Sequence, residues 1–114
     1  MARGDVYLVE IPYSKGPAGR EQAGRRPAVA VQTDDSSSLP TAMIIPTTTN
    51  LKALQFLHTI KMKPSRKNGF TQTSVLLVFQ LRAIDKKRII KKIGQLEQSY
   101  LKQLEKEVRK LLAL

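Results

Sequence analysis

The sequence predicts a single α+β domain in which a small, barrel-like set of strands precedes helices. A chain of 114 residues suits one domain, spanning 1–114, with a modest core. Up to residue 84, short apolar or alternating segments are separated by turns rich in Gly, Pro and Asn. From Asp85 onward, apolar residues recur every three or four positions, as in an amphipathic helix. Short strands followed by helices are typical of α+β domains.

Three strands are expected in the first half of the chain. They cover residues 4–10, 27–33 and 42–46, and 27–33 is the clearest because it is apolar and β-branched. The connection 13–26 is long and rich in Gly, Pro and charge, and loops of this length are usually functional. Residues 34–40 are predicted to form a polar turn.

Two or three further strands are expected before residue 85. Residues 57–62 alternate as a strand, and residues 64–69 form a basic turn that ends in an Asn-Gly pair. The segment 74–79 is continuously apolar, which suits a buried strand. Residues 80–84 extend that strand or begin another one.

Two helices are expected to complete the chain. Asp85 is a candidate N-cap for a short helix over 86–93, with isoleucines on one face and Gly94 at its end. Over 96–112, apolar residues repeat every three or four positions and Glu, Lys and Arg occupy the other face. We therefore predict a terminal amphipathic helix that packs on the sheet or on a partner.

The charge of the chain is strongly positive and unevenly distributed. The formal net charge is +11, and residues 1–50 contribute nothing to it because they hold five basic and five acidic residues. All of the excess lies in residues 51–114, which indicates a polyanionic partner, nucleic acid first. A solubilising surface is the alternative interpretation. Aromatic residues make up only 5% of the chain, which argues against a base-stacking platform for single strands.

Several classes of chemistry are excluded by composition. The chain has no cysteine, so it has neither disulfides nor a thiolate zinc site nor a Cys nucleophile, and this composition suits the cytoplasm. It has a single histidine, His58, so neither a two-histidine ribonuclease nor a His-based metal centre is available. There is no Gly-rich phosphate loop ending in Lys-Ser/Thr and no membrane-length apolar run. We expect no metal, no cofactor and no membrane attachment.

A cationic site without metal remains as the candidate. Cleavage of RNA through its own 2′-hydroxyl requires positive charge on the phosphate, and an Arg side chain can hold two phosphate oxygens at once. The loop before residue 27 offers Arg26 for this role, with Glu21 as a proton acceptor and Thr48 as a hydroxyl that positions it. From the residues alone, a solvated turn is the alternative for the loop, and backbone capping is the alternative for the Thr47–Thr49 hydroxyls.

Motif residues along nearly the whole chain resemble the MazF/PemK/Kid family of toxin endoribonucleases. They are Gly4-Asp5-Val6-Tyr7, Gly19-x-Glu21-Gln22-x-Gly24-x-Arg26-Pro27-x-Val29-x-Val31-Gln32, Pro40-Thr41-Ala42 with Thr48, and Gly69-Phe70-x-x-x-Ser74-Val75-Leu76-Leu77-x-x-Gln80-Leu81-Arg82-x-Ile84-Asp85-Lys86-x-Arg88. The motifs follow one another in order and at close to the family's spacing.

The resemblance implies an SH3-like small β-barrel with a C-terminal helix that forms a symmetric homodimer. It implies metal-independent cleavage of single-stranded mRNA at short sequences, leaving a 2′,3′-cyclic phosphate and a 5′-hydroxyl, and a cognate acidic antitoxin that competes with RNA for the basic groove. By resemblance, Arg26 is the acid and phosphate stabiliser, Thr48 acts as or positions the base, and Glu21 shapes the pocket. The expected RNA-binding residues are Arg20, Gln22, His58, Ser74, Gln80 and Arg82.

The sequence departs from the family pattern at positions that are expected to alter which bases are read. Phe79 stands where an acidic residue is common and Ala83 where Thr is usual, and Gln72-Thr73 replaces a basic–acidic pair. Two other functions stay open at this point. One is a non-enzymatic toxin of the same fold that poisons a protein target such as a topoisomerase, and the other is a basic RNA-binding domain that does not cleave.

Overall fold

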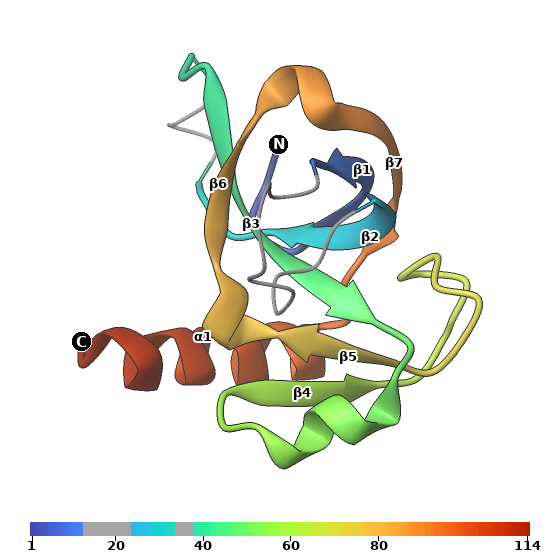
Figure 1. Ribbon diagram of the computed structural model, residues 1–114, viewed down its shortest axis with the longest axis vertical. Coiled ribbons are helices and arrows are strands. Elements are labelled where there is room, and N and C mark those ends of the chain that lie inside the picture. Colours follow the sequence, from blue (N-terminus) through green and yellow to red (C-terminus); the bar gives the residue numbers. More distant parts are fainter. Residues whose placement is uncertain (13–23, 34–37) are drawn as a thin grey trace.

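The computed structural model describes residues 1–12, 24–33 and 38–114, and within these ranges it is a curved antiparallel sheet with one α-helix (Figure 1). The elements are β1 (Asp5–Ile11), β2 (Gly24–Ala30), β3 (Thr41–Thr48), the 3₁₀ turn η2 (Leu51–Gln55), β4 (Thr59–Met62), β5 (Ser74–Leu77), the 3₁₀ turn η3 (Val78–Gln80), β6 (Arg82–Asp85), the 3₁₀ turn η4 (Lys86–Arg88), β7 (Ile89–Gln95) and α1 (Gln98–Leu112). Among the described residues, no helix combines the length and apolarity that crossing a bilayer requires.

Strand β3 joins the two parts of the sheet. The strand order is β4-β5-β3-β2-β1-β7, and β6 pairs with β3 outside this order. On one side β3 pairs with β2, and on the other it pairs first with β6 and then, at Thr47 and Thr48, with β5. The change of partner along β3 curves the sheet, because one strand serves two neighbours that point in different directions. The predicted α+β, small β-barrel-like fold is confirmed.

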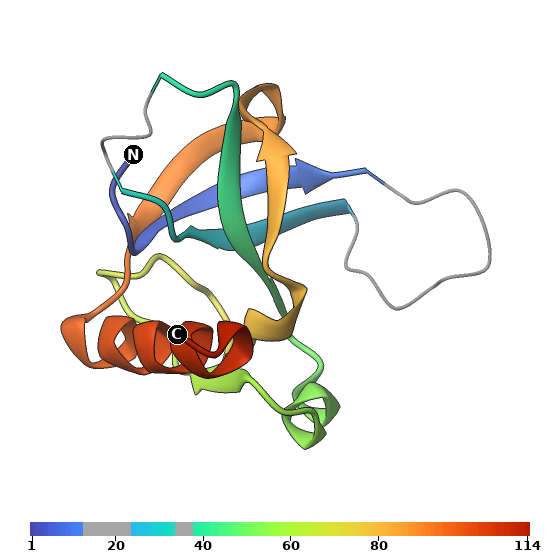
Figure 2. The same cartoon turned by 90° about the vertical axis from the view of Figure 1, so that its left-hand side faces the viewer.

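Apolar side chains fill both faces of this sheet. One core cluster joins Val6, Ile45 and Leu76 to Leu104 of α1, and the other gathers Val9 and further apolar residues on the opposite side. Helix α1 lies beside β4 in both views (Figure 2), so its apolar face covers the first cluster. The predicted terminal amphipathic helix is confirmed, and its packing partner in this chain is the sheet.

The short helix predicted over 86–93 is wrong. Only the 3₁₀ turn η4 forms there, and the Asp85 side chain does cap it by accepting a hydrogen bond from the backbone N–H of Lys87 at 2.9 Å. Residues 89–95 instead form β7, which pairs with the outer edge of β1. The isoleucines of this segment are β-branched and favour a strand, and the free edge of β1 supplies the hydrogen bonds that select it.

Strand boundaries also differ from the predicted ones near the long connection. The second strand runs from Gly24 to Ala30 rather than from 27 to 33, so Arg26 and Pro27 lie inside the sheet. The fourth strand begins at Thr59 rather than at 57, because His58 has a φ of 58° and turns the chain before the strand. Both shifts affect residues that were assigned to the functional site.

A buried carboxylate ties the start of β1 to the end of β7. Asp5 accepts hydrogen bonds from the backbone N–H of Ala2 at 2.8 Å and from the Gln95 side chain at 3.1 Å, and Lys92 Nζ lies 3.3 Å from its Oδ1. Burial alone raises the pKa of Asp5. The bonds from Ala2 and Gln95 and the Lys92 ammonium outweigh it, so the pKa is lowered below the ordinary value of 3.8.

This contact predicts a pH-dependent contribution to stability. Because the folded pKa of Asp5 is depressed, its contribution is fully present above the unfolded value of 3.8 and is lost as pH falls through the lower folded value. We expect Asp5→Asn to reduce the unfolding free energy by about 1–3 kcal/mol at pH 7. Urea denaturation should show that the difference in unfolding free energy between the variant and the parent protein becomes smaller below roughly pH 4. A difference that stays constant down to pH 2 contradicts the assignment.

Candidate functional site

A cleft of about 220 Å³ opens where the start of β2, the end of β3 and segment 70–74 meet. The described residues that line it include Arg26, Thr48 and Ser74. Each comes from a different part of the chain, and the sheet pairing brings them together. Three of the residues predicted from the sequence to form the site therefore share one cavity.

Arg26 and Thr48 lie at opposed positions on neighbouring strands. In the β2–β3 ladder, Ala28 pairs with Pro46, and continuing this register by two residues places Arg26 opposite Thr48. Beyond the paired residues, Thr47 Oγ1 donates a hydrogen bond to the carbonyl oxygen of Pro27 at 2.7 Å and holds the two strand ends together. Opposed residues on one face of an antiparallel pair have Cβ atoms about 5 Å apart. One phosphate can therefore lie against both side chains.

The Thr48 side chain is almost fully buried and its orientation is set by the turn that follows. Thr48 is 8% exposed, and its Oγ1 accepts a hydrogen bond from the backbone N–H of Asn50 at 3.2 Å. Asn50 in turn caps η2 by accepting a hydrogen bond from the Lys52 N–H at 3.1 Å. A hydroxyl has one hydrogen and two acceptor positions, and the Asn50 bond uses one acceptor. The backbone-capping alternative is therefore confirmed at Thr48, which also lines the cleft, and its role toward a phosphate stays a prediction.

Segment 70–74 forms one wall of the cleft. The sequence indicated only some of the residues in this wall. Ser74 is buried, and its Oγ donates a hydrogen bond to the carbonyl oxygen of Gln72 at 3.0 Å. Ser74 was expected to bind RNA, and Gln72 was expected to affect which bases are read; both line the cleft. Thr71 also lines it and was not expected there, and its position close to Ser74 was the signal for it.

Other predicted site residues lie outside the cleft lining or outside the described ranges. Arg20, Glu21 and Gln22 belong to the undescribed ranges. His58 packs against α1, where its Nδ1 lies 3.0 Å from Glu107 Oε2, so the only histidine of the chain has a structural contact.

The last two predicted RNA-binding residues are Gln80 and Arg82. Gln80 lies in η3 and Arg82 begins β6, and neither is part of the cleft lining. Their role in RNA binding stays a prediction, as it does for His58.

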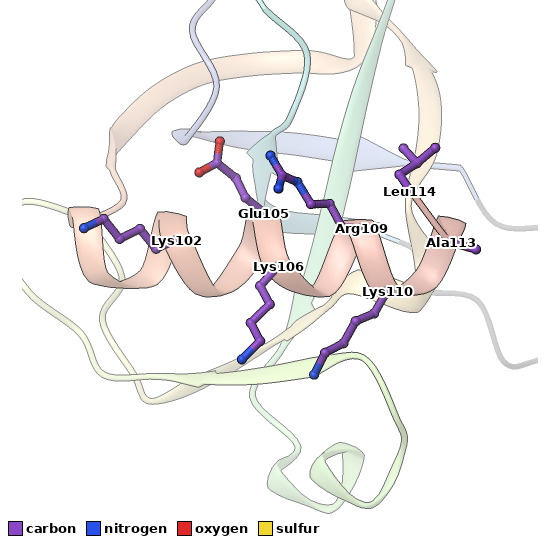
Figure 3. Close-up of a pocket in the computed structure, with 7 residues that line it drawn as sticks. All are labelled: Lys102, Glu105, Lys106, Arg109, Lys110, Ala113 and Leu114. Carbon is purple, nitrogen blue, oxygen red and sulfur yellow. The ribbon is translucent and has the colours of Figure 1, made fainter.

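A second hollow, of about 480 Å³, runs along the exposed side of α1 (Figure 3). It is lined by charged residues of α1, among them Lys102, Lys106 and Arg109, and by the two residues that follow the helix. Its one carboxylate, Glu105, is held by Arg3 at 3.0 Å. This surface offers positive charge but none of the hydroxyl side chains that line the cleft beside Arg26 and Thr48. In the described ranges, no three His, Cys, Asp or Glu side chains come together as metal ligands.

Comparison with known proteins identifies the family. Residues 2–112 match the family described as the PemK-like, MazF-like toxin of type II toxin-antitoxin system. The chain belongs to this toxin family. It is also 30% identical over 115 residues to Endoribonuclease EndoA of Bacillus subtilis (strain 168), an alignment that covers 100% of this chain and 96% of the relative.

Solved structures of PemK/MazF-like toxins share the fold. MazF (Form-I) from Deinococcus radiodurans superposes with a TM-score of 0.78 at 19% identity, over 100% of this chain and 97% of the other. An endoribonuclease in complex with its cognate antitoxin, from Mycobacterial species, gives a TM-score of 0.74 at 16% identity, over 100% and 96% of the two chains. The predicted family and its toxin fold are thus confirmed.

Proposed function

We propose that this protein is an endoribonuclease and acts as the toxin of a type II toxin–antitoxin system. The observation that carries the proposal is the cleft that Arg26 of β2 and Thr48 of β3 line together. The same activity is supported by the family of the chain and by its 30% identity, over its whole length, to an endoribonuclease. The excess of basic residues over acidic ones suits an RNA substrate.

In the proposed reaction the 2′-oxygen of the substrate attacks the adjacent phosphorus and the bond to the 5′-oxygen breaks. The products are a 2′,3′-cyclic phosphate and a 5′-hydroxyl, so no water is consumed. The proposed reaction uses no metal, because Arg26 supplies the positive charge at the phosphate. Arg26 stabilises the charge that develops on the phosphate oxygens. Thr48 orients the 2′-hydroxyl, whose proton passes to Thr48, to Glu21 or to the substrate itself. The departing 5′-oxygen takes a proton from Arg26 or from solvent.

We also propose a homodimer that forms through the apolar surface beside η2. Leu54, Phe56, Leu57 and Phe79 are all exposed there, Leu57 to 81%, and the rings of Phe56 and Phe79 lie 5.5 Å apart. Exposed apolar clusters of this kind mark protein contacts. Because η2 begins three residues after Thr48, a second copy bound there would lie next to the cleft.

Two further features of the proposal concern regulation and location. An acidic antitoxin would bind this +11 protein and compete with RNA for the cleft. The mycobacterial endoribonuclease of similar fold was solved in complex with its cognate antitoxin, which supports such a partner. We place the protein in the cytoplasm, where its mRNA substrate is found.

Cleavage of a defined single-stranded RNA tests the proposed activity. We expect the purified protein to cut such an RNA at specific sites in the presence of EDTA, and we expect ends that carry a 2′,3′-cyclic phosphate and a 5′-hydroxyl. End mapping by mass spectrometry is the measurement. RNA that is bound tightly but stays uncut would support the non-cleaving RNA-binding alternative. RNA that is neither bound nor cut would support the toxin that poisons a protein target.

A further inference from the structure

The cleft has two chemically different walls on either side of β3. Because β3 lies between β2 and β5 in the sheet, Arg25 and Arg26 of β2 line the cleft on one side and segment 70–74, which leads into β5, lines it on the other. The second wall consists of side chains without charge, namely Phe70, Thr71, Gln72 and Ser74. Contacts to phosphate position a nucleic acid, whereas contacts to base edges read its sequence. The two walls therefore suit the two parts of a nucleotide.

Among the described residues that line the cleft, Gln72 alone carries an amide. The hydroxyls of Thr47, Thr48 and Ser74 each make a hydrogen bond to the backbone. The Gln72 side chain, in contrast, is exposed, and no hydrogen bond joins its amide to the described part of the chain. An amide offers an acceptor oxygen beside a donor nitrogen. A single hydroxyl, such as that of Thr71, pairs with any base and discriminates little.

The backbone that carries Gln72 is held on both sides. The backbone N–H of Phe70 donates a hydrogen bond to Asn68 Oδ1 at 3.0 Å, and the carbonyl oxygen of Gln72 accepts one from Ser74 Oγ at 3.0 Å. Phe70 is also buried, and Ser74 pairs with Met62 of β4. A side chain on such a fixed backbone needs little further ordering when it binds a ligand. Gln72 thus combines an anchored backbone with an amide that is available to a ligand.

We propose that Gln72 reads the edge of a base that flanks the bond cleaved between Arg26 and Thr48, and that this base is adenine. The proposal rests on the proposed endoribonuclease function and gives its cleft a sequence-reading wall. The amide oxygen accepts a hydrogen bond from the N6 amino group of adenine and the amide nitrogen donates one to N7, a pairing that glutamine favours. In a single strand these base edges are open to side chains. Gln72 is a specificity-determining residue, because it contacts the substrate away from the reacting atoms.

The first test sequences the 5′-hydroxyl ends that the protein and its variants produce from a randomised single-stranded RNA. We expect the parent protein to favour adenine at one position next to the cut by about ten-fold or more, as one bidentate contact warrants. Gln72→Ala should abolish this preference. Gln72→Arg should move it to guanine, because a guanidinium donates two hydrogen bonds to O6 and N7 of guanine. Gln103→Ala, which changes an exposed glutamine of α1 outside the cleft lining, should leave the preference as it is.

The second test identifies the atoms that are read. Substrates carry at this position either 7-deazaadenine, which lacks the N7 acceptor, or purine, which lacks the N6 amino group. For the parent protein each analogue should lower kcat/KM roughly three- to ten-fold, as the loss of one hydrogen bond warrants, and for Gln72→Ala neither should. The proposal is overturned if the parent favours no adenine next to the cut or if the Gln72 variants keep the parent's preference. Equal effects of the analogues on the parent and on Gln72→Ala overturn it too, since Gln72 is then a solvated loop residue.

Failure of the proposed function gives a different result. If the parent protein binds RNA without cutting it, fluorescence anisotropy replaces the cleavage assay, with short single-stranded RNAs that differ by adenine or guanine at one position. A preference for adenine that Gln72→Arg moves to guanine then supports the Gln72 contact in a protein that does not cleave. The same preference in parent and variant overturns the contact. If the parent protein does not bind RNA, both proposals are overturned.

Discussion

Replacement of Arg26 by Ala should lower the rate of RNA cleavage about a thousand-fold while the protein stays folded. Arg26 lies in the cleft opposite Thr48, and the loss of one donor that stabilises developing charge costs roughly 10²- to 10³-fold in other enzymes. Arg26→Lys should recover only part of the loss, because an ammonium cannot hold two phosphate oxygens in the planar, bidentate geometry of a guanidinium. Single-turnover cleavage of a short RNA measures both variants, and circular dichroism checks that they fold.

The neighbouring arginine provides a matched control. Arg25 also borders the cleft, but it alternates with Arg26 in β2 and pairs with Glu10 of β1 in the ladder. Arg25→Ala removes the same charge, so it should weaken RNA binding about as much and slow the chemical step less than ten-fold. Equal losses in kcat for the two variants would mean that only net positive charge matters at this site. The specific role of Arg26 would then be wrong.

The sequence indicated that Arg26 and Thr48 belong to one site, but it did not show what brings the two residues together. Family resemblance indicated both residues, whereas the residue types alone allowed a solvated turn at one and a backbone cap at the other. What places them together is the register between β2 and β3, continued past Ala28 and Pro46. Register depends on pairing between segments that are distant in sequence. The predicted strand began at residue 27, so the prediction left Arg26 outside the sheet.

The strand β7 shows a second limit of local reasoning. The segment after Asp85 repeats its isoleucines at a spacing that fits a helix, and Gly94 fits a helix end. The edge of β1 decides the outcome, since it accepts β7 from Ile89 to Gln95. His58 is a similar case, because its contact is with Glu107, far along the chain in α1. Neither partner is visible in the local pattern.

The wall of the cleft is anchored by a buried asparagine at the end of the basic turn. Asn68 is fully buried, and its Oδ1 accepts hydrogen bonds from the backbone N–H groups of Ser65 and Phe70, both at 3.0 Å. Its Nδ2 donates to the carbonyl oxygen of Lys63 at 3.0 Å and to Glu97 Oε1 at 3.2 Å. These bonds fix the backbone just before the segment that lines the cleft. The Asn-Gly pair therefore serves the site as well as the turn.

The largest effect on stability should come from Gly69→Ala, which we expect to reduce the unfolding free energy by about 3–5 kcal/mol. Gly69 has a φ of 75°, which is costly for any residue with a side chain, and a Cβ atom there would collide with the backbone carbonyl oxygen of Ile93 in β7. Backbone cannot yield as a side chain can, so β7 or the 70–74 wall must move. Urea denaturation measures the loss.

A comparison with Gly4→Ala separates two contributions to this loss of stability, the steric collision of the Cβ atom and the positive-φ backbone conformation. Gly4 also has a positive φ, of 94°, but a Cβ atom there would meet only the Leu101 side chain, at 3.3 Å, and that side chain can shift. We expect Gly4→Ala to reduce the unfolding free energy by about 1–2 kcal/mol, because only the left-handed backbone conformation is then unfavourable. The difference between the two variants then reports how rigidly β7 holds the turn. If both variants lose the same unfolding free energy, β7 can move away from a Cβ atom at position 69 at little cost. The geometry of the cleft wall must then be fixed by the Asn68 hydrogen bonds rather than by β7.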